Sequence, residues 1–340
     1  MSDDNRQPPQ GDDPWKSPEG DEPICAERRS LLRAASALAA GAALFDPAQA
    51  QQAGGTPSAA APLSIPGFAP ARIDVGGGVT INAAKGGSGP PLLLLHGAPL
   101  TLYTWRDVAP QLAEDFTVVA ADLRGYGDSS KPQGAADHSN YSKRAMASDQ
   151  VAVMQHFGFD RFAVVGQDRG GRVTHRMALD HADKVTKAVL IDIVPTYYLY
   201  THVNIDFVQA YFHWFNYLRA APAPENELLA AQAGRQVSGA QAEYQRANGT
   251  PEGVHGMCED YRAGASIDLQ HDAADLDSKI RCPLHVLWAE NGAMDKLYDV
   301  LAIWRERART VTGKGMPGGH NMQEGAPAEV LAELRTYLGA

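Results

Sequence analysis

The fold is decided by the segment FAVVGQDRG at residues 162–170. Its first four residues are all apolar, and a short continuous apolar run is typical of a strand buried on both faces of a parallel sheet. Gly166 and Gly170 flank Asp168, and glycine tolerates the tight bend by which a strand turns directly into a helix. We therefore predict a strand–turn–helix that lifts the Asp168 carboxylate into a cleft. The alternative is that this carboxylate only caps the helix that follows.

Outward from this bend, short β-rich runs alternate with helical stretches from residue 71 to the end of the chain. Such alternation is typical of a mostly parallel sheet covered by helices. Eight strands are predicted, at residues 73–75, 79–83, 91–95, 117–121, 162–165, 188–191, 285–288 and 310–312. The clearest helices are predicted at residues 142–157, 170–181 and 327–338. The predicted fold class is therefore α/β, with an eight-stranded, mostly parallel sheet flanked by helices.

The alternation stops between residues 195 and 280. This segment carries aromatic runs, a proline-rich stretch at 221–224 and helical sequence rich in Ala, Gln and Glu, but no clear strand. Because it lies between the sixth and seventh predicted strands, we expect a helical cap over the carboxyl edge of the sheet, where open α/β sheets place their binding sites. The core would then comprise residues 70–194 and 281–340.

The N-terminal segment does not have the character of a folded domain. A polar, acidic leader is followed by Arg28-Arg29, a modest apolar run to Phe45, and Ala48-Gln49-Ala50, whose small residues suit a signal peptidase. Paired arginines before such a run are typical of a twin-arginine export signal. We expect residues 1–50 to be a signal peptide, residues 51–69 to be a flexible lead-in, and the mature protein to be periplasmic. The alternative is an Ala-rich amphipathic helix behind a disordered tail.

The composition limits the classes of partner. The 340-residue chain has a formal net charge of −10, which argues against nucleic acid, because phosphate binding relies on basic patches. No stretch approaches the roughly 20 apolar residues that span a bilayer, so we expect no membrane span. Cys258 and Cys282 have no diagnostic spacing and are expected to be buried apolar residues rather than a disulfide. We expect no metal and no cofactor, and the oligomeric state stays open, with a homodimer compatible with the sequence.

A carboxylate at the bend narrows the reaction. Serine at such a position attacks carbonyl carbon, whereas a carboxylate can displace a leaving group from saturated carbon and form an alkyl-enzyme ester. Water must then cleave this ester with the help of a general base. His320 is the candidate base, because its loop at residues 318–322 lies between the last strand and the last helix. The implied chemistry is dehalogenation or epoxide opening.

An acid should orient His320 and stabilise its cation. After the seventh strand, where this acid often lies, glycine occupies the expected position in the sequence Trp288-Ala289-Glu290-Asn291-Gly292. Asp192 lies instead in an apolar run at the end of the sixth strand, and a charge buried there needs a partner. We therefore choose Asp192, with Asp295 and Glu290 as the alternatives.

The run His96-Gly97-Ala98-Pro99 follows the leucine-rich strand at residues 91–95. The backbone N–H of Ala98, together with that of Arg169, would hold the oxyanion that forms when water attacks the ester. His96 itself is expected to be structural, and the loop at residues 122–129 is assigned no chemistry.

Arg169 and Arg172 lie one and four positions after Asp168. Two guanidinium groups beside an anionic nucleophile would be unusual for a neutral substrate, but the planar arginine fork binds a carboxylate well. The same cations would offset the repulsion between Asp168 and an anionic substrate, and would keep Asp168 ionised. We therefore expect a small carboxylate substrate. The alternative is a surface salt-bridge cluster.

Four motifs together resemble the haloacetate (fluoroacetate) dehalogenase family of α/β-hydrolases: GQDRGGR at 166–172, LIDIVPT at 190–196, HWF at 213–215 and MCEDYRA at 257–263. The resemblance covers essentially all of residues 70–340. It implies an α/β-hydrolase fold with an inserted helical cap. It also implies hydrolysis of haloacetates or small 2-haloacids to 2-hydroxy acids and halide.

The resemblance also implies a role for each matching residue. Asp168 matches the family's nucleophile, His320 its general base and Asp192 the acid that orients the base. Arg169 and Arg172 match the pair that binds the substrate carboxylate. The cap residues that receive the departing halide are matched by His213, Trp214 and Tyr261. Several donors at once suit fluoride, because this poor leaving group needs its developing charge stabilised.

The chain also departs from the family pattern. Ala98 stands where members often have phenylalanine, the cap between Trp214 and Tyr261 is shorter than usual, and residues 215–287 contain no tryptophan. These differences predict a looser pocket that favours larger 2-haloacids, or chloride and bromide over fluoride. The halogen preference and the natural substrate stay open.

Three other functions are weighed against this one. An epoxide hydrolase shares the Asp-His-Asp set but typically has tryptophan after the nucleophile, where this chain has Arg169. The same arginine argues against a haloalkane dehalogenase, whose substrate is also neutral. A non-catalytic protein that binds small carboxylates would have no need of the complete Asp-His-Asp set.

Overall fold

The computed structural model describes residues 61–339. The predicted signal peptide at residues 1–50 lies outside this part of the chain, as does most of the predicted lead-in. No helix within residues 61–339 combines the length and apolar character needed to pass through a membrane.

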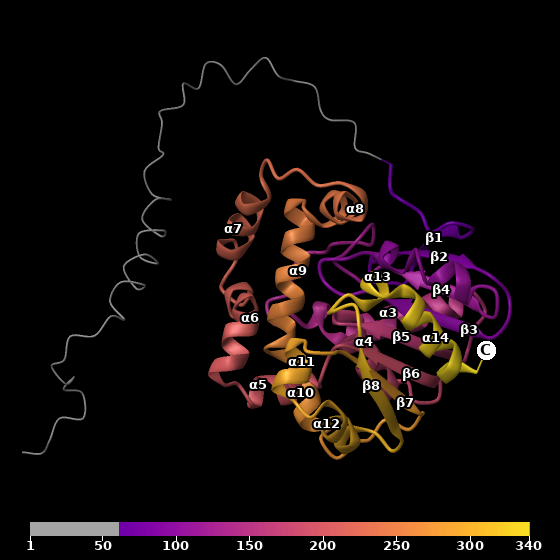
Figure 1. The fold of residues 1–340 in the computed structure, drawn as a ribbon. Coiled ribbons are helices and arrows are strands. Elements are labelled where there is room, and N and C mark those ends of the chain that lie inside the picture. Colours follow the sequence, from indigo (N-terminus) through magenta and orange to yellow (C-terminus); the bar gives the residue numbers. More distant parts are fainter. Residues whose placement is uncertain (1–60, 340) are drawn as a thin grey trace, which may run out of the picture. The chain divides into compact units, whose positions relative to one another are not determined.

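An eight-stranded sheet forms the centre of the fold (Figure 1). Its strand order is β1-β2-β4-β3-β5-β6-β7-β8. The strands from β3 to β8 are parallel, whereas β1 and β2 pair antiparallel with their neighbours. The bounds are β1 (Ala69–Asp74), β2 (Thr80–Gly86), β3 (Pro91–Leu95), β4 (Thr117–Ala121), β5 (Phe162–Gln167), β6 (Val185–Ile191), β7 (Leu284–Ala289) and β8 (Val311–Met316). The predicted α/β-hydrolase fold is confirmed, and each predicted strand overlaps one observed strand.

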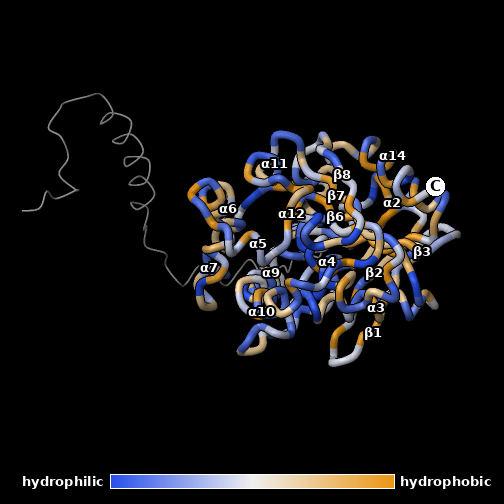
Figure 2. The backbone as a smooth tube through the Cα atoms, turned by 90° about the horizontal axis from the view of Figure 1, so that it is seen from below, coloured by the Kyte–Doolittle hydropathy of each residue, from blue (hydrophilic) through white to orange (hydrophobic). Residues whose placement is uncertain are grey.

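Apolar side chains fill a core on each face of this sheet. Leu93 and Leu95 belong to one core and Leu92 and Leu94 to the other, as expected for a strand that is buried on both faces. Figure 2 shows hydrophobic colour along the strands in the middle of the molecule and hydrophilic colour on many of the outer helices and loops.

Helices cover both faces of the sheet. The first core is closed by α3 (Lys143–His156), α4 (Arg169–Asp180) and α12 (Val300–Arg307), and the second by α2 (Ala109–Leu112) and α14 (Pro327–Leu338). The three clearest predicted helices correspond to α3, α4 and α14. The short elements are η2 (Leu102–Trp105), η3 (Ser139–Tyr141), α11 (Ala293–Leu297) and α13 (Met322–Gly325).

Six helices lie between β6 and β7, where the cap was predicted, and they group on one side of the sheet in Figure 1. They are α5 (Thr196–Thr201), α6 (Ile205–Tyr217), α7 (Ala223–Gln232), α8 (Gly239–Asn248), α9 (Pro251–Gly264) and α10 (Ile267–Ala274). Local sequence signals begin two of them. The Asn204 side chain caps α6, and Thr250 caps α9, which has proline at its first position, a combination that favours helix starts. Cys258 and Cys282 are buried and unpaired.

Candidate active site

The backbone bends sharply at Asp168, between the end of β5 and the start of α4. Asp168 has φ 44° and ψ −111°, and its side chain makes no hydrogen bond that caps α4. A Cβ atom on Gly166 would lie 2.3 Å from the carbonyl oxygen of Gly170, and one on Gly170 would lie 2.6 Å from the carbonyl oxygen of His96. Only glycine therefore fits on either side of the bend. The strained conformation exposes the carboxylate to a cavity instead of using it as a cap.

Asp168, His320 and Asp192 come together from three loops at the carboxyl edge of the sheet. The Nδ1 atom of His320 lies 2.5 Å from Oδ2 of Asp192. On the other side of the ring, Nε2 lies 4.0 Å from Oδ2 of Asp168. Oδ1 of Asp192 accepts a hydrogen bond of 2.9 Å from the N–H of Ala289, which fixes the carboxylate. A neutral His320 in this arrangement carries its proton on Nδ1 and presents Nε2 as a base.

The two alternative acids do not take part. The Asp295 carboxylate accepts hydrogen bonds from Nε1 of Trp288 and from the N–H of Asn291. Among the contacts of residues 61–339, neither Asp295 nor Glu290 forms a hydrogen bond or ion pair with His320. Asp192 is therefore the carboxylate that pairs with His320.

The electrostatics of the three groups suit a nucleophile and a base. Burial alone would raise the pKa of Asp168, but the nearby charges of His320, Arg169 and Arg172 outweigh it and lower that pKa. For His320, desolvation would lower the pKa, yet the hydrogen bond with Asp192 and the charge of Asp168 raise it above 6.5. Asp168 is therefore ionised at neutral pH. The same surroundings stabilise the protonated form of His320.

The N–H of Ala98 points at the carboxylate of Asp168, with 3.1 Å between N and Oδ2. The loop comes this close because Gly97 has no side chain, since a Cβ there would lie 2.4 Å from Oε1 of Gln167. Arg169 is the first residue of α4, so its backbone N–H lacks an intrahelical acceptor. Of the two N–H groups predicted to bind the oxyanion, that of Ala98 lies on the loop after β3, and that of Arg169 lies at the start of α4, directly after Asp168.

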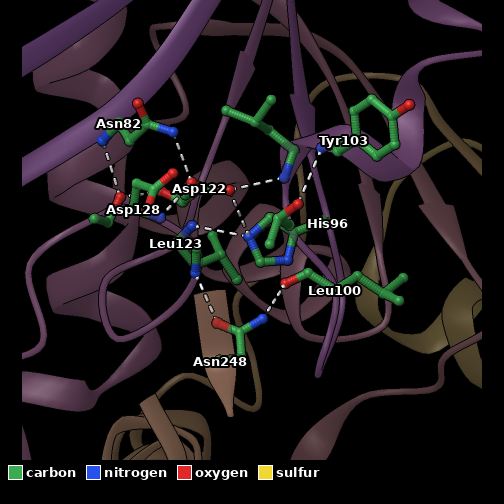
Figure 3. Close-up of polar contacts among 12 residues, drawn as sticks. Asn82, His96, Leu100, Tyr103, Asp122, Leu123, Asp128 and Asn248 are labelled. Carbon is green, nitrogen blue, oxygen red and sulfur yellow. Dashed lines mark hydrogen bonds and ion pairs between the residues drawn. The ribbon is translucent and has the colours of Figure 1, made fainter. Parts of the chain in front are cut away.

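His96 holds this loop from behind, as predicted for a structural residue (Figure 3). Its Nε2 accepts a hydrogen bond of 3.1 Å from the N–H of Leu123, and its Nδ1 lies 2.8 Å from the carbonyl oxygen of Gly97. Because the carbonyl can only accept, Nδ1 carries the proton. The ring is fully buried and has no free nitrogen for chemistry.

A cavity of about 290 Å³ contains most of the predicted site residues. It is lined by Ala98, Asp168, Arg172, Asp192, Ala210, Tyr211, His213, Trp214, Tyr261, Ala289, Gly292, Ala293, Met294, Gly319 and His320. The lining combines loops after β3, β5, β6, β7 and β8 and helices α4 and α11 of the core with helices α6 and α9 of the cap. Another cavity, of about 380 Å³ between α5, α10 and α12, contains none of the predicted residues. The cavity of about 290 Å³ is therefore the candidate active site.

Both predicted arginines are buried, so they do not form a surface cluster. Arg172 lines the cavity and donates hydrogen bonds to the carbonyl oxygen of Val194 at 3.2 Å and to Oγ1 of Thr196 at 3.0 Å, while its Nε has no partner. Arg169 is not among the lining residues, and its guanidinium stacks on the ring of Tyr261, with 3.4 Å between Cζ and the ring centroid. Nε and one terminal nitrogen of Arg169 also lack hydrogen-bond partners. Unpaired buried guanidinium nitrogens are costly, and an anionic ligand in the cavity would satisfy Nε of Arg172.

A buried carboxylate that we did not predict lies behind Arg169. Asp260 is fully buried on α9, and its Oδ2 lies 3.5 Å from Nε of Arg169 and accepts a hydrogen bond of 2.6 Å from Tyr126. Its other oxygen pairs with the Lys143 ammonium group. The MCEDYRA motif contains Asp260, but the partners Tyr126 and Lys143 are more than a hundred residues away. No local pattern could have revealed this network.

The predicted halide-binding residues come from two cap helices. α6 carries His213 and Trp214, and a non-helical turn of its backbone at Tyr211 (φ −125°, ψ 31°) precedes them. The rings of Trp214 and Tyr261 meet edge to face at 5.6 Å between centroids. Burial raises the pKa of Tyr261 and lowers that of His213, so Tyr261 keeps its O–H donor and His213 stays neutral. Tyr211, which also lines the cavity, was missed because a kink has no clear sequence signal.

No group of three or more His, Cys, Asp or Glu side chains within residues 61–339 is arranged to hold a metal ion. The described part of the chain therefore offers no candidate metal centre beside the Asp-His-Asp set.

Comparison with known proteins shows the family of this chain. A family model described as alpha/beta hydrolase fold matches residues 90–324. The fluoroacetate dehalogenase of Burkholderia sp is 44% identical over 287 residues, which cover 80% of this chain and 94% of that protein. The chain belongs to the haloacetate dehalogenase family of the α/β-hydrolases. It is a hydrolase.

Two further proteins are also similar to this haloacetate dehalogenase family chain. A soluble epoxide hydrolase from Corynebacterium sp. is 32% identical, over 75% of this chain and 92% of that protein. A solved structure from Nostoc sp PCC 7120, assigned to the alpha/beta hydrolases, superimposes with a TM-score of 0.76 at 46% identity. It covers 80% of this chain and 98% of that chain.

Proposed function

We propose that this protein hydrolyses the carbon–halogen bond of haloacetates and small 2-haloacids, giving a 2-hydroxy acid and halide. One observation carries the proposal: a buried carboxylate with a histidine–aspartate pair behind it shares a cavity with the buried Arg172. The carboxylate supports attack on saturated carbon, and the arginine supports an anionic substrate. The fluoroacetate dehalogenase relative supports the same reaction.

In the first step, Asp168 displaces the halide. Because Oδ2 of Asp168 is held by the N–H of Ala98, Oδ1 is the oxygen that attacks the carbon bearing the halogen. A carbon–oxygen bond forms as the carbon–halogen bond breaks, and the halide leaves with the bonding electron pair. The N–H of Trp214 and the O–H of Tyr261, with His213 at the rim, donate to the charge that the halide acquires.

In the second step, water cleaves the ester. The 4.0 Å between Nε2 of His320 and Oδ2 of Asp168 is too long for a direct hydrogen bond, and leaves His320 free to bind a water. His320 takes one proton, the hydroxide adds to the carboxyl carbon of Asp168, and Oδ2 becomes the oxyanion. Collapse expels the 2-hydroxy acid, whose alkoxide takes the proton back from His320. The proton left on the Asp168 carboxyl passes to solvent, which restores the carboxylate.

Arg172, together with Arg169, is proposed to bind the substrate carboxylate. Replacing Arg172 with leucine should raise KM for chloroacetate about 10- to 100-fold, because a charge-assisted hydrogen bond contributes about 1.5–3 kcal/mol. Arg172→Lys keeps the charge but not the planar fork, and its KM should lie between those of the parent and of Arg172→Leu. Initial rates of chloride release against substrate concentration give KM. An unchanged KM in Arg172→Leu would remove this side chain from substrate binding.

The pKa shifts predict how turnover depends on pH. His320 must be neutral to accept a proton. In the ester the charge of Asp168 is gone, but the hydrogen bond with Asp192 still raises the pKa of His320, so kcat should fall about tenfold per unit as the pH drops below the pKa that His320 has in the ester. The pKa of Asp168 is lowered, so the attacking carboxylate stays ionised over the same range. With bromoacetate, kcat/KM should therefore stay level from pH 8 to pH 5.5 while kcat declines. A parallel decline of both would contradict the assignment of His320 to the second step alone.

A halide-release panel tests the proposed function. Purified protein is incubated with fluoroacetate, chloroacetate, 2-chloropropanoate and styrene oxide, and halide or diol is measured. We expect halide from the acids and no diol. A single turnover in heavy-oxygen water should give a product whose hydroxyl oxygen is light, because that oxygen comes from Asp168. Heavy oxygen in the first product would exclude the ester.

An epoxide hydrolase remains the second candidate, because Tyr211 and Tyr261 both line the cavity and could protonate an epoxide oxygen. The soluble epoxide hydrolase relative supports it. The buried Arg172 beside Asp168 argues against a neutral substrate. Diol from styrene oxide without halide from any acid would favour this candidate.

A further inference from the structure

Asn248, the last residue of α8 in the cap, makes three hydrogen bonds to the backbone of the core, and Figure 3 shows the one to Leu100. Its Nδ2 donates to the carbonyl oxygens of Pro99 at 2.7 Å and Leu100 at 3.0 Å. Its Oδ1 accepts from the N–H of Gly127 at 2.8 Å. Carbonyls only accept and an N–H only donates, so these partners fix the orientation of the amide. Asn248 is 6% exposed, and its bonds to Leu100 and Gly127 are buried.

Two of these bonds reach the turn that carries the oxyanion donor. Gly97 to Leu100 form a four-residue turn closed by a hydrogen bond of 2.9 Å from the N–H of Leu100 to the carbonyl oxygen of Gly97. Ala98, inside the turn, directs its N–H at Asp168. The turn is therefore held on one side by the proposed nucleophile and on the other by a cap side chain. Among residues 61–339, Asn248 is the only cap residue with a hydrogen bond to this turn.

Other links hold the neighbouring loops at their base. The loop after β3 is tied to the loop after β4 by His96, which accepts from Leu123, and by Asp122, whose Oδ1 accepts from the N–H of Leu102 at 2.7 Å. These residues all belong to the core. They fix where the turn begins and ends, but no side chain of this network bonds to the carbonyls of Pro99 and Leu100. Within the described residues, Asn248 is the only side chain that donates hydrogen bonds to these two carbonyls.

We propose that Asn248 is a positioning residue through which the cap sets the N–H of Ala98 for hydrolysis of the ester. The inference rests on the proposed function. The donor matters most when water attack places a full charge on Oδ2 of Asp168, which happens only in the second step. Asn248 therefore controls the breakdown of the ester more than its formation.

This role has a specific kinetic signature. In a two-step covalent reaction, kcat/KM reports the steps up to formation of the ester, whereas kcat includes its breakdown. Slower breakdown lowers kcat and KM together and leaves kcat/KM unchanged. A merely structural defect at the cap would instead lower kcat/KM or the amount of folded enzyme.

The experiment uses Asn248→Asp and Asn248→Ser with bromoacetate. The aspartate keeps an acceptor for Gly127 but loses the donor to the turn, and the serine removes the amide without adding charge. Arg246→Gln is the matched control, because Arg246 lies on the same helix and binds Asp128 of the same core loop without touching the turn. Thermal melting reports folding, bromide release gives the rates, and intact-protein mass after acid quenching measures the ester.

Both Asn248 variants should show kcat lowered about 10- to 100-fold, since loss of a whole oxyanion donor costs about 10²–10³-fold. Their kcat/KM should stay within about threefold of the parent, and the ester should accumulate. Arg246→Gln should resemble the parent. The inference is overturned if kcat is unchanged, if kcat/KM falls as far as kcat, or if the control accumulates ester equally. If one variant does not fold, the other decides. A parent enzyme that releases no halide from any haloacid would overturn the proposed function itself.

Discussion

Replacing Asp168 with alanine should abolish halide release from haloacids, with a loss of about 10⁴-fold or more, because no other carboxylate in the cavity can attack the carbon. Asp192, the other aspartate of the lining, is held by His320 and by the N–H of Ala289. Halide release is followed with chloroacetate over hours at high enzyme concentration. The melting temperature is measured alongside to show that the variant is folded, because alanine keeps the strained positive φ and removes the charge that faces the buried arginines.

Asp295→Ala provides the control for this variant. Asp295 is an exposed carboxylate near the same sheet edge that bonds to Trp288 and Asn291, and its loss should leave the rate within about twofold of the parent. Halide release from Asp168→Ala at more than about a thousandth of the parent rate would remove Asp168 from the mechanism.

Replacing His320 with glutamine should stop the reaction after one turnover. Asp168 would still expel the halide, since Arg169 and Arg172 still lower its pKa, but water would lack a base to cleave the ester. We expect a burst of one halide per protein molecule, a kcat lowered by about 10²–10⁴-fold, and a protein mass increased by one carboxymethyl group. Rapid-quench halide assays and intact-protein mass measure these quantities.

Asp192→Asn should also give a halide burst, with a smaller loss of kcat than His320→Gln. The base would remain in this variant but would lose the anion that stabilises its cation. Steady turnover by His320→Gln at the parent rate would show that another group activates the water. A burst missing altogether would show that His320 is needed already for the attack on the haloacid.

The sheet was readable from the sequence because parallel strands buried on both faces appear as continuous apolar runs. The leucines at residues 92–95 and the segment at 162–165 are such runs, and both became central strands. Strand ends were less accurate. β5 continues to Gln167, whose backbone still pairs with Ile191 of β6, although its side chain is polar and resembles the start of a turn. Backbone pairing, and not side-chain polarity, decides where a strand ends.

The cavity residues were predictable where a motif sits on a strand end, as for Asp168 and Asp192. The position of Arg169 was not. The sequence suggests a side chain that faces the substrate directly, whereas the guanidinium stacks on Tyr261 and pairs with Asp260. Asn248 was missed as well, because its contacts join segments 121 to 149 residues apart. The export signal at residues 1–50 stays a prediction.

The positive φ angles of Asp168 and Asp192, 44° and 55°, have a consequence for protein engineering. Conformations of this kind cost on the order of 1–3 kcal/mol each when the residue is not glycine. Libraries screened only for heat resistance should therefore enrich glycine at these two positions, and the survivors would be robust but inert. Selection for a tougher catalyst must demand turnover in every round.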